Sequence, residues 1–77
     1  MQKSKGKVAS VNESLVGAQI TNGAVMNGEV AYIIIEDGKR LKAEVIDIKD
    51  GDKVYLQVFE DTSWMKVGDL VEFTSLP

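Results

Sequence analysis

The sequence predicts an all-β fold, and three observations carry that prediction. Six short segments are rich in residues that favour strands, and every connection between them contains glycine, asparagine or aspartate. No segment has a convincing helical pattern, and the only proline stands at position 77, where it interrupts no strand. Short strands at regular spacing indicate a sandwich or a barrel. Closure into a barrel is favoured because it removes exposed strand edges.

Taken in order, the chain is divided by turn signals. Turns are expected at residues 12–14, 21–23, 27–28, 37–38 and 49–52, and the longest loop at residues 60–69. Gly17 falls inside a strand, which predicts a bulge or a close backbone approach there. The expected strands are residues 6–11, 15–20 and 29–36, the two arms of a hairpin within 40–62, and residues 70–74.

The hairpin within residues 40–62 is the strongest local signal. Its turn contains Asp50-Gly51, a pair that supplies the positive φ that a tight turn needs. Apolar and polar residues alternate on both arms, which places the apolar set on one face of each strand. The residues predicted to face inward are Leu41, Ala43 and Val45 on the first arm and Val54, Leu56 and Val58 on the second.

The alternation changes phase at Val45-Ile46, since the next apolar residue after Ile46 is Ile48. A strand that keeps one face inward throughout would not show this change. We interpret it as a β-bulge or bend of the kind that curves small barrels. The simpler alternative is that Ile46 is an exposed apolar residue. The aromatic residues Tyr32, Tyr55, Phe59 and Phe73 are expected in the core or in the barrel wall.

Composition excludes several classes of function. The 77 residues form one domain, 1–77, without cysteine or histidine, so disulfides and the commonest general base and metal ligand are absent. The net charge of −3 argues against nucleic acid as the main partner. No apolar run reaches the length of a membrane span and no signal peptide is recognisable, which predicts a soluble intracellular protein without direct membrane insertion.

The sequence contains no phosphate-binding loop motif and no nucleophile with an activating base. No catalytic, cofactor-binding or metal-binding residue is therefore predicted. The carboxylate pairs Asp50/Asp52 and Glu60/Asp61 lie in turns and are best explained as solvated. Trp64 and Met65 are unusual, because large apolar residues in a polar loop often contact something. Two interpretations are equally favoured: they plug the end of the barrel, or they contact a partner.

Several segments together resemble one family. In their order and spacing they are similar to the N-terminal barrel of the catalytic A subunit of V-type rotary ATPases, with the run from Gln57 to Thr62 and then 66–69 as the most specific part. Trp64 and Ser75 depart from the pattern, since many relatives carry glycine there. The matching segments are GKVASVN at 6–12, GAVMNGEV at 23–30, LKAEVI at 41–46, LQVFEDT at 56–62, KVGD at 66–69 and VEFT at 71–74.

The resemblance implies a closed six-stranded antiparallel, Greek-key-like barrel. It also implies that the barrel holds together the alternating A–B hexamer of a soluble ATPase head, peripheral to the membrane, that couples ATP synthesis or hydrolysis to proton or sodium transport. ATP or ADP and Mg²⁺ would bind to other domains of a longer subunit. We expect the chain alone to be a monomer or weak dimer, with Trp64, Met65 and Lys66 as possible interface residues. The alternative is a stand-alone OB-like binding barrel.

Overall fold

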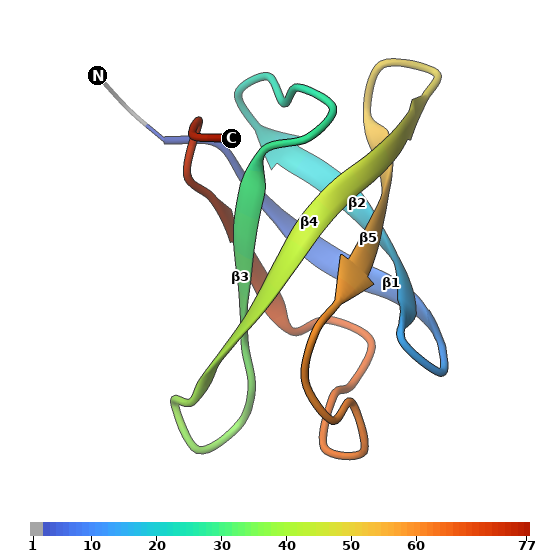
Figure 1. Ribbon diagram of the computed structural model, residues 1–77, viewed down its shortest axis with the longest axis vertical. Coiled ribbons are helices and arrows are strands. Elements are labelled where there is room, and N and C mark those ends of the chain that lie inside the picture. The colour runs from blue at the N-terminus through green and yellow to red at the C-terminus, as the bar shows by residue number, and fades with distance from the viewer. Residues whose placement is uncertain (1–2) are drawn as a thin grey trace.

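The computed structural model describes residues 3–77; Met1 and Gln2, the first two residues of the predicted domain, lie outside the described residues. Six antiparallel strands close into a barrel in the order β1-β2-β5-β4-β3-β6 (Figure 1). Within residues 3–77 there is no helix, and therefore none long enough to cross a membrane. The strands are β1 (Lys5–Asn12), β2 (Leu15–Asn22), β3 (Val30–Ile34), β4 (Arg40–Lys49), β5 (Lys53–Val58) and β6 (Leu70–Phe73).

The topology contains a Greek key. Strands β3, β4 and β5 form two consecutive hairpins, and β6 returns along the 59–69 loop to pair with β3 rather than with β5. That spatial order, with the fourth strand beside the first, defines the motif. Pairing of β1 with both β2 and β6 then closes the sheet. The predicted closed, six-stranded, Greek-key-like barrel is confirmed.

The barrel interior is filled by the alternating apolar residues of all six strands. The predicted inward residues of the 40–62 hairpin are all buried, and Val58 is only 3% exposed. β1 contributes Val8, β3 contributes Ile33, and β6 contributes Val71 and Phe73. Since a two-residue period sends neighbouring side chains to opposite faces, the same strands present their polar residues outside.

The phase change in β4 is a β-bulge. Val45 lies opposite Leu56 and Asp47 opposite Tyr55, so Ile46 has no partner in the ladder. Ile46 is exposed, whereas Ile48 returns to the barrel and packs against the core. The predicted bulge is therefore confirmed, and the alternative that Ile46 is an exposed apolar residue also holds.

Two glycines mark close approaches within the sheet. A Cβ on Gly17 would lie 2.5 Å from the hydroxyl of Ser10, beside the register shift between Val8 and Ser10 in β1. This matches the bulge or close approach predicted at Gly17. A Cβ on Gly6 would lie 2.6 Å from the backbone carbonyl oxygen of Gln19, a constraint that the sequence pattern did not reveal.

Some expectations need correction. Phe59, expected in the core or wall, is 58% exposed because it follows the last residue of β5 and begins the long loop. Strand β3 is shorter than predicted: it lacks Glu29 and ends before Ile35, whose N–H instead donates to the carbonyl of Lys39. Likewise β6 ends at Phe73 rather than at residue 74.

The buried carboxylate of Glu29 holds residues 74–76 against the barrel. Its two oxygens accept hydrogen bonds from the backbone N–H groups of Met26, at 2.7 Å, and Ser75, at 2.8 Å. The N–H of Val30 also donates to the carbonyl of Leu76 at 2.7 Å. Hydrogen bonds to a charged acceptor are stronger than neutral ones, so Glu29 fixes the course of residues 74–76 across the 24–29 loop.

Candidate interface loop

The loop of residues 59–69 crosses from β5 to β6 at one end of the barrel, at the bottom of Figure 1. It is attached to β1 by backbone hydrogen bonds, from Val8 N–H to the carbonyl of Asp69 at 2.8 Å and from Gly68 N–H to the carbonyl of Val8 at 2.7 Å. The hydroxyl of Thr62 donates to the carbonyl of Glu13 at 2.8 Å. These three contacts hold the loop against the β1–β2 hairpin, so its side chains are presented from a fixed backbone.

The loop separates the two apolar residues that the sequence placed together. Met65 is only 8% exposed and belongs to the core cluster, so it plugs the barrel end. Trp64 is 74% exposed and lines a cleft with Ile35, Glu36 and Asp37, which follow β3. The plug interpretation therefore applies to Met65, while Trp64 is the residue with a surface available to a partner.

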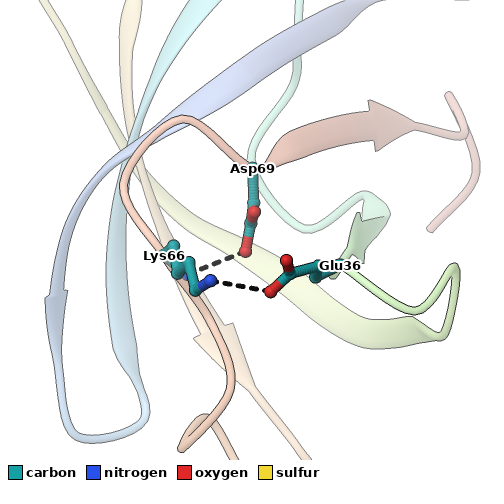
Figure 2. Close-up of polar contacts among 3 residues, drawn as sticks. All are labelled: Glu36, Lys66 and Asp69. Carbon is teal, nitrogen blue, oxygen red and sulfur yellow. Dashed lines mark hydrogen bonds and ion pairs between the residues drawn. The ribbon is translucent and has the colours of Figure 1, made fainter.

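Lys66 points back across the barrel end to Glu36 (Figure 2). Its ammonium nitrogen lies 2.7 Å from a carboxylate oxygen of Glu36, and both side chains are exposed. The backbone N–H of Lys66 donates to the carboxylate of Asp69 at 2.7 Å, and Asp69 N–H donates to the carbonyl of Lys66 at 3.1 Å. The turn 66–69 is thus closed on itself and connected to the β3–β4 turn through one ion pair.

Sequence reasoning selected Lys66 but missed Glu36, which lies 30 positions earlier in the chain. The only available signal was local: an Asp-Gly turn follows Glu36, which places it at the end of a hairpin. That β3 and the 59–69 loop share one end of the barrel follows from the Greek-key connection. A pattern along a single strand does not contain this information.

Three exposed charged side chains at this end of the barrel have shifted pKa values: Glu36, Asp61 and Lys66. Lys66 lowers the pKa of Glu36 by its hydrogen bond and its positive charge, and Glu36 raises the pKa of Lys66 in the same way. The hydroxyl and then the N–H of Ser63 lower the pKa of the Asp61 carboxyl. Exposed ion pairs contribute little to stability, so the main effect of the Lys66–Glu36 pair is to orient the loop. Among residues 3–77, no three His, Cys, Asp or Glu side chains are grouped as a metal site.

Replacing Lys66 by methionine should raise the pKa of Glu36 towards its ordinary value of 4.5. Because the folded-state pKa is lowered, the ion pair stabilises the fold above the unfolded pKa and loses this effect as the pH falls through the lowered value. NMR titration of the Glu36 carboxyl carbon measures the shift directly. Lys49→Met, which removes an exposed lysine elsewhere, serves as the control. An unchanged Glu36 titration in Lys66→Met would mean that the ion pair does not persist in solution.

Comparison with known proteins gives one consistent result. A family model described as ATP synthase alpha/beta family, beta-barrel domain, matches residues 8–75. The V-type ATP synthase alpha chain of Treponema denticola is 46% identical over 74 residues, covering 96% of this chain and 12% of that protein. The V-type ATP synthase alpha chain of Borreliella burgdorferi is 50% identical over 70 residues, covering 91% of this chain and 12% of that protein.

The matched region covers nearly the whole barrel. Residues 8–75 run from Val8 within β1 to just beyond β6, so the family match covers strands β2 to β6, most of β1 and the 59–69 loop. The chain spans only about an eighth of the length of the curated relatives, since 12% of each is covered. The chain belongs to the beta-barrel domain of the ATP synthase alpha/beta family, with V-type ATP synthase alpha chains among its relatives.

Proposed function

We propose that this chain is the N-terminal barrel of a V-type ATP synthase alpha-chain subunit and that it joins neighbouring subunits in a hexameric ring. The observation that carries the proposal is the family match over residues 8–75, which covers nearly all of the closed barrel. The relatives are named as V-type ATP synthase alpha chains. A barrel whose interior is filled by apolar side chains suits a structural task.

In this proposal the barrel holds subunits together while ATP, ADP and Mg²⁺ bind elsewhere in the parent subunit. The absence of histidine and of a phosphate-binding loop supports the placement of nucleotide binding outside this domain. The neighbours are the alternating A-type and B-type subunits of the ring. The assembly lies in the cytoplasm, peripheral to the membrane, and couples ATP synthesis or hydrolysis to ion transport.

The 59–69 loop is our candidate for one contact in that ring. Trp64 supplies an exposed aromatic surface, the residue type most enriched among energetically important interface positions. The Lys66–Glu36 pair and the Asp69 hydrogen bond hold the loop in place before it meets a partner. A preorganised loop loses less conformational entropy on binding. Met65 contributes indirectly, by anchoring the loop in the core.

The test is made in the full alpha-chain subunit assembled with its partner subunit. Trp64→Ala should accelerate hexamer dissociation, because truncating a central aromatic contact typically costs about 2 kcal/mol or more. Lys66→Glu should have a smaller effect in the same direction, since it disrupts the Glu36 pair. Dissociation is followed by mass photometry after dilution.

The matched control is Met26→Ala, which truncates another exposed apolar residue in a different loop. Circular dichroism of each isolated barrel checks that the fold is intact. Hexamers of both loop variants that dissociate at the same rate as the Met26→Ala hexamer would remove residues 64–66 from the interface.

A further inference from the structure

Glu29 is the only charged side chain that is buried among residues 3–77. It is 3% exposed, and neither of the two ion pairs within that range involves it. A carboxylate that is removed from water without a cation destabilises a fold unless hydrogen bonds replace its contacts with water. The barrel already has a continuous apolar core, so the burial of Glu29 points to a task other than filling the interior.

The two hydrogen bonds of Glu29 join segments that lie far apart in the sequence. Its Oε1 accepts from the N–H of Met26, three positions earlier, and its Oε2 accepts from the N–H of Ser75, 46 positions later. Both oxygens therefore act as acceptors, whereas a glutamine side chain of the same shape has only one acceptor oxygen. The arrangement is specific for a carboxylate, because an amide at position 29 would break one of the two connections.

The chain turns sharply at Ser75 and is held on both sides of that turn. The φ angle of Ser75 is +65°, in the left-handed region that residues with a side chain rarely adopt. Before the turn, the hydroxyl of Thr74 donates to the carbonyl of Val30 at 2.7 Å. After the turn, the N–H of Leu76 donates to the Thr74 hydroxyl at 3.2 Å, and the N–H of Val30 donates to the Leu76 carbonyl at 2.7 Å. These contacts fix the direction of residues 74–76.

The beginning of the described chain belongs to the same group of contacts. Ser4 is 6% exposed, its hydroxyl donates to the carbonyl of Ala24, and its own carbonyl accepts from the N–H of Phe73 at 3.0 Å. A Cβ on Gly23 would lie 2.2 Å from the Ser4 hydroxyl oxygen, so the two segments pack without a gap. We call this group of segments, residues 4, 23–30 and 73–76, the junction. It lies at the top of the barrel in Figure 1.

We propose that Glu29 is a positioning residue that sets the direction in which the chain leaves the barrel, so that the barrel and the part of the parent subunit that follows it move as one body. The inference rests on the proposed function, in which the barrel belongs to a longer subunit. Glu29 acts through Ser75, at the turn itself, and through Met26, which connects the turn to the 23–29 loop.

The length of the barrel makes the angle at Ser75 important. The junction and the 59–69 loop lie at opposite ends of the barrel, whose longest dimension is 29 Å (Figure 1). A small rotation at the junction therefore displaces the 59–69 loop by a large distance. With a flexible junction, each barrel would lose orientational freedom when its subunit enters the ring, and that loss opposes association. A junction that is fixed in advance avoids it.

The first test uses Glu29→Gln in the 77-residue chain. Backbone order parameters from ¹⁵N relaxation should fall at residues 75 and 76 from about 0.85, the value of rigid backbone, to below about 0.6. The six strands should keep their wild-type values. Glu13→Gln makes the same chemical change at an exposed turn residue and should leave residues 75 and 76 rigid. Val54→Ala truncates a core residue, so it lowers the stability of the barrel without touching the junction.

A role of Glu29 in stability alone predicts that Val54→Ala and Glu29→Gln have similar effects on residues 75 and 76, and that result would refute the positioning role. Unchanged order parameters in Glu29→Gln would refute it equally. Thr74→Val provides a second approach if Glu29→Gln does not fold. It removes the hydroxyl between Val30 and Leu76 while keeping the shape of the side chain, and it should loosen residue 76 in the same way.

The second test uses the full subunit with ¹⁵N only in the barrel, prepared by protein ligation. In the unchanged subunit, the strand resonances should relax at the rate of the whole subunit. In Glu29→Gln they should relax more slowly and give narrower lines, as expected for a barrel that tumbles separately. Independent tumbling in the unchanged subunit would rule out a rigid junction. Failure of the unchanged subunits to form a ring would instead overturn the proposed function, and the result on the 77-residue chain would still stand.

Discussion

Replacing Val58 by aspartate is expected to unfold the barrel. Val58 is 3% exposed, lies opposite Ala43 of β4, and belongs to the core cluster. A carboxylate there has no cationic partner, and leaving a charge buried and uncompensated costs about 3–5 kcal/mol. Protonation would reduce that cost, but only by raising the pKa far above the ordinary range for aspartate. A domain of this size has a total stability on the order of 5 kcal/mol, so little or none remains.

The matched control is Val67→Asp, because Val67 is 70% exposed in the 59–69 loop. Urea titration followed by circular dichroism should give a folded baseline for Val67→Asp and none for Val58→Asp. Lowering the pH should partly restore the fold of the Val58→Asp chain, since a neutral carboxylic acid is easier to bury than a carboxylate. A Val58→Asp chain with the unfolding midpoint of the wild type would mean that β5 presents its other face to the core.

The alternation of side chains made the barrel largely predictable. The inward residues of the 40–62 hairpin follow from a two-residue period, because each strand of a small barrel has one buried face. The bulge at Ile46 was visible as a break in that period. Phe59 was misplaced because hydrophobicity alone does not show where a strand ends. The close contact at Gly6 depends on the carbonyl of Gln19 in the partner strand, which no local pattern reports.

The candidate interface was predictable only in part. A tryptophan in a polar loop was a sufficient signal for Trp64, but the same signal did not distinguish it from Met65, which is buried. The contact of Glu36 with Lys66 depends on which strands become neighbours. The 59–69 loop leads into β6, which pairs with β3, and Glu36 lies just beyond the end of β3.

Deleting the barrel should abolish the ring while leaving nucleotide binding in place. In our account residues 3–75 supply contacts between subunits, whereas ATP and Mg²⁺ bind in other domains of the parent subunit. Interfaces of modest area persist in large assemblies because several are made at once, so the loss of one domain from each subunit releases many contacts together. The effect should therefore exceed that of any single loop variant.

A full-length subunit with Val58→Asp is the matched control for deletion, since it keeps the chain length but loses the folded barrel. Native mass spectrometry of the alpha-chain subunit mixed with its partner subunit and ATP measures the outcome directly. We expect hexamers for the wild type, and for both altered subunits only smaller species that still carry bound nucleotide. Hexamers of undiminished stability without residues 3–75 would show that this barrel does not hold the ring together.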